Sequence, residues 1–285
     1  MKFSMEAIAL NMKKRNKIAG AIYGFAIGDA MGATTEFMDS WQICKHHGQV
    51  RNIIGGGWLN LKPGEVTDDT QMTICVMNAL MKTLREDDPM GYLFRMDCRK
   101  EFIKWYQSGP KDVGGQCSRA INYLYGGKHL ETYHDSQALG NGSLMRAMPC
   151  AVLNKPFLND LQGKMTHNNE TCSRLIQNYS RLIQDYINGN LYTGNIKGLL
   201  EPSGYIWNTF NNSIYWSCKN SFEEAIIGAV NHGGDADTIA AITGSLAGAR
   251  FGYDAIPERW IKQLNPEVKE ILEKFKNFTF TYLQI

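Results

Sequence analysis

The stretch CSRLIQNYSRLIQDYI, residues 172–187, carries the clearest evidence for the fold. Its apolar side chains recur every three or four residues, which is the period of a helix with one buried face. The pattern ends at Asn188-Gly189, a pair typical of a helix end. The spacing therefore predicts an amphipathic helix over residues 172–187.

Other segments of the chain repeat this period. Residues 72–84 and 266–275 show the same spacing, and the second segment opens with Pro266 at a first helical position. Ser221 and Glu224 form a capping-box pattern ahead of an apolar run. Few segments alternate with the period of two that is typical of a half-buried strand. We therefore predict an all-α protein.

The length and composition of the chain favour one compact multi-helix domain. The 285 residues fit a single large domain, and 44% apolar residues are enough for a sizeable core. No linker or internal repeat is visible in the sequence. We expect a short N-terminal extension over residues 1–14, followed by one domain over residues 15–285.

Charge and cysteine content narrow the possible partners and the compartment. A net charge of +2 creates no large field, so neither nucleic acid nor an anionic membrane is expected as a partner. No apolar run approaches the ~18 residues that span a bilayer. The seven cysteines are odd in number and form no C-x-x-C pair, which favours reduced thiols and a cytoplasmic protein.

One apolar segment near the N-terminus has glycines at helical spacing. Gly20, Gly24, Gly28 and Gly32 fall every four residues, so a second helix could pack closely against them. Asp29 lies among apolar neighbours in this segment, and we expect its carboxylate to be buried and paired. A role in capping a neighbouring helix and a role in a functional site are equally consistent with this position.

Two acidic clusters are the strongest indication of a functional site in the sequence. They are Val66-Thr67-Asp68-Asp69-Thr70 and Gly233-Gly234-Asp235-Ala236-Asp237-Thr238. Each places two carboxylates and at least one hydroxyl directly before an apolar helical pattern. Oxygen ligands at this density suit hard divalent cations such as Mg²⁺ or Mn²⁺. Four carboxylates converging from two segments are enough for a two-metal site that orients a water and a substrate diol or phosphate.

A structural role is the alternative for these clusters. Thr or Asp before a helix acts as an N-cap, and Asp in a first turn is favoured by the helix dipole. Asp68 with Gln71 also fits a capping box. Each cluster alone favours capping, whereas the two together, with glycines around the second, favour a metal site.

Four further positions could bring polar groups to a ligand. Glu36 follows the glycine-rich helix and could reach into a cleft. Asp112 lies in a Gly-Pro turn and could contact a substrate or form an Asx turn. The turn Gly140-Asn141-Gly142-Ser143 precedes a helical pattern and offers backbone N–H groups that suit a phosphate. His167 lies just before the helix at 172–187 and is equally consistent with a structural group or a ligand.

With these residues assembled, the chain resembles the ADP-ribosylglycohydrolase family, and most closely its bacterial dinitrogenase reductase-activating glycohydrolase branch. The pairing of Thr-Asp-Asp-Thr with Gly-Gly-Asp-Ala-Asp-Thr, in this order, is highly specific. The matching segments extend from about residue 15 to residue 275 and are 28–37, 66–70, 105–114, 140–149, 166–168, 203–205 and 231–260.

The resemblance implies an all-α, single-domain enzyme that holds two Mg²⁺ or Mn²⁺ ions. The reaction that it implies is hydrolysis of the N-glycosidic bond between ADP-ribose and an arginine of a mono-ADP-ribosylated protein. The metal ligands that it implies are Thr67, Asp68, Asp69, Asp235, Asp237 and Thr238.

The resemblance also implies roles for the remaining candidates. Glu36 would lie near the metals and the scissile ribose, and Asp68, Asp69 or Glu36 could be the general base. Asp112 would lie near the ribose and could protonate the departing guanidine. The substrate-binding residues that it implies are Asn141, Gly142 and Ser143 at the pyrophosphate, His167 in the pocket and Tyr205 beside the adenosine.

Several other functions remain open at this point. A related protein could be purely structural, as J1-type lens crystallins are, although the intact acidic set argues against this. It could be an immunity protein that binds a cognate ADP-ribosyltransferase toxin. It could also hydrolyse serine-linked or small-molecule ADP-ribose conjugates, or a phosphoester.

Overall fold

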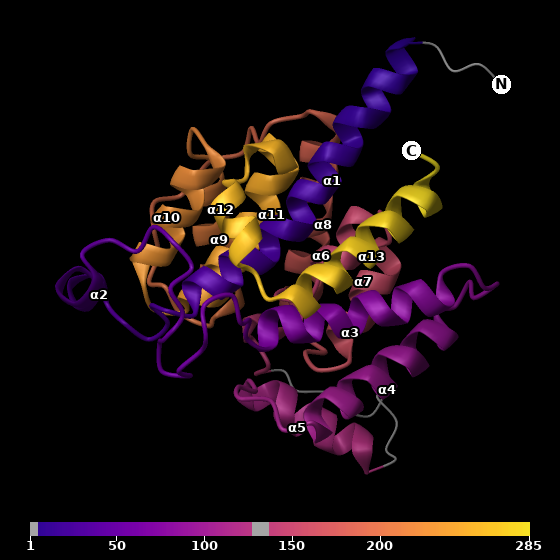
Figure 1. Ribbon diagram of the computed structural model, residues 1–285. Coiled ribbons are helices and arrows are strands. Elements are labelled where there is room, and N and C mark those ends of the chain that lie inside the picture. Colours follow the sequence, from indigo (N-terminus) through magenta and orange to yellow (C-terminus); the bar gives the residue numbers. More distant parts are fainter. Residues whose placement is uncertain (1–4, 127–136) are drawn as a thin grey trace.

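A computed structural model describes residues 5–126 and 137–285 (Figure 1). Within these ranges the chain forms α-helices, short 3₁₀ segments and turns, with isolated β-bridges but no strand. The helices are α1 (Met5–Gly32), α2 (Ser40–His47), α3 (Asp68–Thr83), α4 (Tyr92–Gln107), α5 (Gly115–Tyr125), η2 (Asn141–Ser143), α6 (Met148–Val152), α7 (Pro156–Lys164), α8 (Glu170–Asn188), α9 (Ile206–Ser217), α10 (Phe222–His232), α11 (Ala236–Phe251), η3 (Tyr253–Ala255), α12 (Glu258–Gln263) and α13 (Pro266–Leu283). The all-α prediction is confirmed.

The helices that apolar spacing predicted are present as α3, α8 and α13. Gly189 is the C-cap of α8, and its φ of 94° is the left-handed conformation typical of that position. Ser221 is the N-cap of α10, and its hydroxyl accepts the Glu224 N–H at 3.1 Å. The Glu224 carboxylate accepts the Asn220 N–H instead of that of the capping residue, so only half of the predicted capping box forms.

The start of α3 differs from the predicted capping box. Thr67 is the N-cap, and its hydroxyl accepts the Asp69 N–H at 3.3 Å. Asp68 is the first helical residue, and the Gln71 amide donates to the Val66 carbonyl. The interpretation of Asp68 as a cap paired with Gln71 is therefore wrong, because the Thr67 hydroxyl already fills that position. Neither Asp68 nor Asp69 therefore caps the helix.

α1 and α11 approach one another along a seam of small residues. A Cβ atom built on Gly24 would lie 2.2 Å from the Gly244 carbonyl oxygen, and one built on Gly28 would lie 2.0 Å from the Ala240 carbonyl oxygen. Only glycine permits backbones to come this close. The prediction that the glycine spacing allows close helix packing is confirmed, and the contact brings Asp29 beside the first turn of α11.

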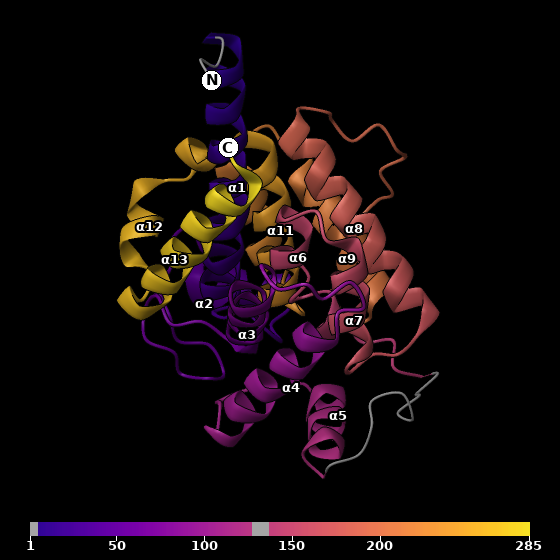
Figure 2. The ribbon, with the colours of Figure 1, turned by 90° about the vertical axis from the view of Figure 1, so that its right-hand side faces the viewer.

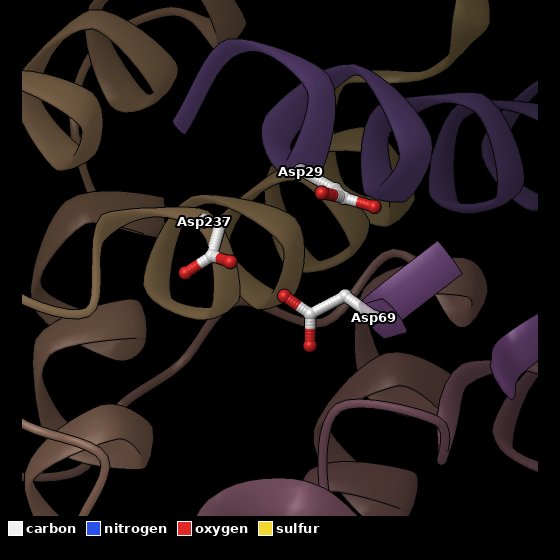
Figure 3. Close-up of side chains that lie close together, drawn as sticks. All are labelled: Asp29, Asp69 and Asp237. Carbon is white, nitrogen blue, oxygen red and sulfur yellow. The ribbon is translucent and has the colours of Figure 1, made fainter. Parts of the chain in front are cut away.

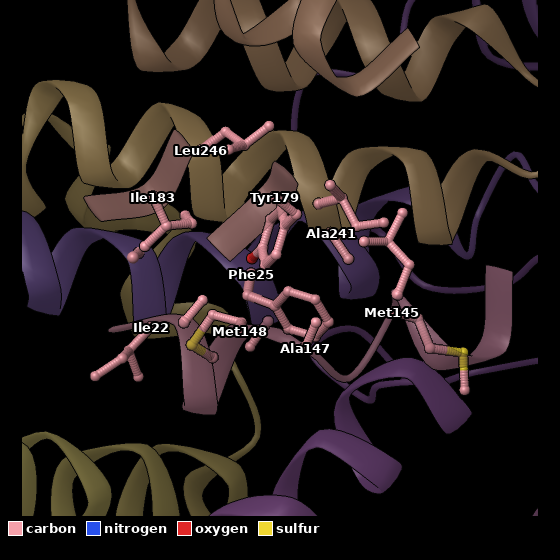
Figure 4. Close-up of a cluster of buried hydrophobic side chains, with 14 of the residues drawn as sticks. Ile22, Phe25, Met145, Ala147, Met148, Tyr179, Ile183, Ala241 and Leu246 are labelled. Carbon is pink, nitrogen blue, oxygen red and sulfur yellow. The ribbon is translucent and has the colours of Figure 1, made fainter. Parts of the chain in front are cut away.

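The core surrounds this helix pair. Figure 4 shows Ile22 and Phe25 of α1 packed with Met148 of α6, Tyr179 of α8 and Leu246 of α11, and all five side chains are buried. Burying a side chain of this size contributes about 1.5–3 kcal/mol. This packing therefore holds the central helices in place and fixes the positions of the residues at their ends.

α1 is continuous across the expected boundary between residues 14 and 15. Its first turns extend beyond the other helices in both views (Figures 1 and 2). Of the helices in the described ranges, none combines the length and the apolar character required to cross a membrane.

Candidate active site

The two acidic motifs meet at the ends of three helices. α3 and α11 both begin beside the last turn of α1, and the Thr238 hydroxyl donates to Asp69 Oδ1 at 3.3 Å. The Thr-Asp-Asp-Thr and Gly-Gly-Asp-Ala-Asp-Thr motifs are therefore in direct contact, although they lie far apart in the sequence.

Asp29, Asp69 and Asp237 form an inner cluster, one residue from each of α1, α3 and α11 (Figure 3). Each contributes a carboxylate oxygen within 4.8 Å of the others, and all three are buried. Burial, and then repulsion by neighbouring carboxylates, raises the pKa of Asp69 and of Asp237 well above the ordinary range. Asp69 Oδ2 is buried and accepts no hydrogen bond from any described residue. An orphaned oxygen among crowded carboxylates is the environment that a divalent cation fits.

Asp29 both caps a helix and belongs to the acidic cluster. Its Oδ1 accepts the Thr67 hydroxyl at 2.8 Å and the Thr67 N–H at 3.1 Å, and its Oδ2 accepts the Thr70 N–H at 3.0 Å. Burial raises the pKa of Asp29 to about 6, although these hydrogen bonds oppose the shift. Because the Thr67 hydroxyl donates to Asp29 and accepts one N–H, one lone pair of its oxygen remains for a cation.

Glu36, Asp112 and Asp237 form an outer cluster, with one oxygen of each within 4.8 Å of the others. Asp237 is thus common to both clusters. Glu36 is 6% exposed, and its Oε2 accepts the Trp58 indole N–H at 2.6 Å. Burial raises the pKa of Glu36 to about 8, against the Trp58 hydrogen bond and with help from the Asp112 charge. The outer cluster therefore holds a carboxyl suited to proton transfer near neutral pH.

The other two aspartates tie neighbouring loops to the site. Asp68 Oδ2 accepts the Gly114 N–H at 3.3 Å, which fixes the loop before α5. Asp235 Oδ2 accepts the Asn141 side-chain amide, which fixes the turn at residues 140–143. Burial raises the pKa of Asp68 to about 7 and that of Asp235 to about 6.

A cavity of about 370 Å³ opens above the acidic clusters. Most of the predicted site residues line it, namely Glu36, Asp68, Asp112, Asn141, Gly142, His167, Asp235, Asp237 and Thr238. Thr67, Asp69 and Ser143 are buried behind this lining. Tyr205 is 42% exposed and lies outside the lining, but it is joined to Gly140 by an isolated β-bridge.

Two aromatic residues of the cavity, Phe37 and Trp58, had no role predicted from the sequence. Trp58 follows the glycines at 55–57, each of which has a positive φ. That glycine run is the one signal in the sequence that the backbone turns sharply here. Phe37 directly follows Glu36, and a single aromatic residue carries no pattern from which its position could be deduced.

A buried arginine supports the part of the cavity wall formed by Gly142 and His167. Arg146 is fully buried and donates to the carbonyls of Gly142 and Gln162, and to the Thr166 hydroxyl oxygen at 2.6 Å. The Thr166 oxygen in turn lies 2.8 Å from His167 Nδ1. The other ring nitrogen of His167, Nε2, faces the turn at residues 140–142.

The burial of His167 predicts how the stability of the protein depends on pH. Burial, and then the Arg146 charge, lowers the pKa of His167 to about 3. Below about pH 6.5 the unfolded chain binds a proton at this residue and the folded protein does not, so falling pH costs stability. Between pH 6.5 and 5.5, the unfolding free energy of wild type should fall by about 1 kcal/mol more than that of His167→Gln. Urea titrations at both pH values measure this difference, and parallel losses in the two proteins would contradict it.

A larger groove, of about 730 Å³, lies beside α10 but offers no comparable acidic cluster. Glu223 pairs with Arg259, and Glu224 accepts the Asn220 N–H. Both carboxylates of this groove thus already have protein partners. The smaller cavity is therefore the candidate active site.

Comparison with known proteins agrees with this assignment. The family model for ADP-ribosylglycohydrolase matches residues 10–202 and 173–280. The ADP-ribosyl-(dinitrogen reductase) glycohydrolase of Rhodospirillum rubrum is 33% identical, over 91% of this chain and 94% of the relative. The ADP-ribosylarginine hydrolase Tri1 of Serratia proteamaculans is 28% identical, over 87% of this chain and 75% of the relative.

A solved structure agrees as well. It is described as an ADP-ribosylglycohydrolase-related protein complex, and it superposes with a TM-score of 0.78 at 26% identity, over 96% of this chain and 99% of that chain. The family resemblance drawn from the motifs is thus confirmed. The chain belongs to the ADP-ribosylglycohydrolase family and is a hydrolase of ADP-ribosyl groups.

Proposed function

We propose that the protein hydrolyses the N-glycosidic bond between ADP-ribose and a protein arginine, releasing ADP-ribose and reversing mono-ADP-ribosylation. The observation that carries this proposal is the convergence of both acidic motifs on one cavity, with Asp237 common to two carboxylate clusters. The names of two relatives, which refer to ADP-ribosyl dinitrogen reductase and to ADP-ribosylarginine, support the choice of a protein arginine linkage.

We further propose that the site holds two divalent cations, Mg²⁺ or Mn²⁺. The residues that would hold them are Thr67, Asp68, Asp69, Asp235, Asp237 and Thr238, and the orphaned Asp69 oxygen supports this assignment. Bound cations of this kind orient hydroxyls and lower the pKa of a coordinated water below the value of about 15.7 in bulk solvent. Asp29 is assigned to positioning, because both of its oxygens already accept hydrogen bonds from the start of α3.

The remaining residues divide into a proton-transfer side and a phosphate side. Of the three candidate bases, Asp68 and Glu36 line the cavity whereas Asp69 lies behind it, so we assign the base to Asp68 or Glu36. Asp112 is assigned to protonating the guanidine that leaves, since burial raises its pKa. The turn at residues 140–142 and His167 would bind the pyrophosphate.

On the phosphate side, Tyr205 is assigned to the adenosine. The β-bridge between Tyr205 and Gly140 supports this, because it joins the tyrosine backbone to the turn that would bind the pyrophosphate. Ser143, whose side chain is buried at the end of that turn, would act by shaping it rather than by touching the substrate.

Release of free ADP-ribose from an arginine-ADP-ribosylated protein tests the proposal. Release is expected with Mg²⁺ or Mn²⁺ and should stop with a chelator. Asp235→Ala should reduce it by about a hundredfold or more, since several kcal/mol of charge stabilisation depend on the ligand set. If metal binds but no ADP-ribose is released, the arginine linkage is refuted and serine-linked or small-molecule conjugates become the proposed substrates. No metal binding would refute the two-cation site.

Location and partners follow from the same chemistry as further proposals. The seven cysteines are all free, which supports a reducing, cytoplasmic environment. An ADP-ribosyltransferase must supply the substrate. Direct binding between this hydrolase and a cognate transferase is a separate proposal, which co-purification of the two proteins tests.

A further inference from the structure

Phe37 has a backbone conformation that a bulky residue rarely adopts. Its φ is 62°, in the left-handed region that favours glycine. Two backbone hydrogen bonds hold it there: the Phe37 N–H donates to the Gly234 carbonyl at 2.7 Å, and the Gly234 N–H donates to the Met38 carbonyl at 2.8 Å. Phe37 is nevertheless 67% exposed, so burial of its ring does not offset the strain. Strain of this kind gathers at functional sites.

Trp58 lies beside Phe37 at the mouth of the cavity. The two ring centroids are 5.4 Å apart, the rings are tilted by 50°, and both residues line the cavity. Trp58 is 49% exposed, and its indole N–H is held by Glu36. Since the N–H is occupied, the ring faces are what this residue offers to a ligand. We call Phe37 and Trp58 the aromatic rim.

The carboxyl groups beside the aromatic rim select the kind of ligand. Glu36 and Asp112 lie at this end of the cavity, and a cation favours the ionised form of a carboxyl whereas a pyrophosphate disfavours it. Exposed aromatic faces beside carboxylates suit a planar cation, because a guanidinium stacks on rings and pairs with carboxylates. A neutral serine side chain offers neither interaction.

We propose that the aromatic rim is the acceptor subsite, which binds the guanidinium and alkyl stem of the modified arginine and gives preference for arginine over serine linkages. This inference rests on the proposed function, and it goes further by assigning the part of the substrate that leaves. It makes Phe37 a specificity-determining residue and gives Trp58 two tasks, stacking and positioning of Glu36.

The decisive variant is Phe37→Gly, because it removes the ring and also relieves the backbone strain. We expect KM for an arginine-linked ADP-ribosyl peptide to rise about three- to thirtyfold, the range of a cation–π contact. The kcat value, the affinity for free ADP-ribose and KM for a serine-linked peptide should stay near wild type. The melting temperature should not fall, which separates loss of the subsite from loss of the fold.

Two further variants separate the tasks of Trp58. Trp58→Phe keeps an aromatic face but loses the donor to Glu36, so kcat should fall while KM for the arginine-linked peptide changes little. Trp58→Ala should affect both constants. Trp41→Ala is the matched control, since Trp41 is 66% exposed on the neighbouring helix but does not line the cavity, and it should behave as wild type.

An unchanged KM in Phe37→Gly, or an equal rise for both linkages, would overturn the acceptor subsite. If wild type releases nothing from the arginine-linked peptide, the proposed function fails instead. In that case the acceptor subsite is tested by binding, by comparing the affinity for the intact arginine conjugate with the affinity for free ADP-ribose. Tighter binding of the conjugate that is lost in Phe37→Gly supports the aromatic rim, and equal binding refutes it.

Discussion

Asp69→Asn is expected to abolish hydrolysis while making the metal-free protein more stable. Asparagine keeps the shape and can still accept the Thr238 hydroxyl, but it removes an ionisable group whose charged form is disfavoured by burial and by Asp237. A loss of about 4 kcal/mol of transition-state stabilisation corresponds to roughly a thousandfold fall in rate. Relief of repulsion between buried carboxylates should raise the melting temperature in the presence of a chelator.

The metal response provides the control for this prediction. Mn²⁺ should raise the melting temperature of wild type, because a ligand that binds only the folded state stabilises it, and it should have little effect on Asp69→Asn. Asp254→Asn, at an exposed position in η3, should resemble wild type in both assays. A variant that loses activity and also melts lower in chelator would indicate that Asp69 stabilises the fold rather than the metal site.

Gly28→Ala is expected to destabilise the protein by about 3 kcal/mol or more. Alanine favours a helix over glycine by about 1 kcal/mol, so propensity alone predicts a gain. The new Cβ, however, would lie 2.0 Å from the Ala240 carbonyl oxygen, an atom of the α11 backbone that cannot rotate away. The clash must separate α1 from α11, and urea unfolding measures the resulting loss.

Gly115→Ala is the matched change for this experiment. Gly115 begins α5, and the nearest atom to its added Cβ is an Arg119 side-chain nitrogen at 3.7 Å. Its unfolding free energy should change by less than about 0.5 kcal/mol. Equal effects of the two substitutions would show that helix propensity, and not the seam between α1 and α11, controls the outcome.

The fold was predictable where local patterns were strong. Repeated apolar spacing identified α3, α8 and α13, and the glycine spacing indicated that α1 packs closely against another helix. The partner of α1 could not be deduced, because small residues also occur in α11 for reasons that only the tertiary packing reveals. The incorrect cap at Asp68 came from the same limit, since two neighbouring residues could each fill the position.

The acidic part of the site was predictable because its residues carry a dense and specific pattern. Its surroundings depend on contacts between loops that the sequence does not encode locally. The hydrogen bond from Trp58 to Glu36 forms after the glycine turn at residues 55–57. Arg146 donates to the turn at residues 140–142, and its sequence motif contains no acidic residue that would predict its position. Ser143 belongs to the predicted phosphate-type turn, yet packing buries its side chain, which does not line the cavity.

The seam between α1 and α11 also limits how this enzyme can be regulated. Its glycines interlock at intervals of four residues, so the two helices cannot slide past one another gradually. The next matching register is four residues away, about 6 Å along the axis, which is a jump and not an adjustment. Control of activity is therefore expected to act on the loops that carry Phe37, Asp112 and Asn141, while the helix ends that hold the carboxylates keep a fixed register.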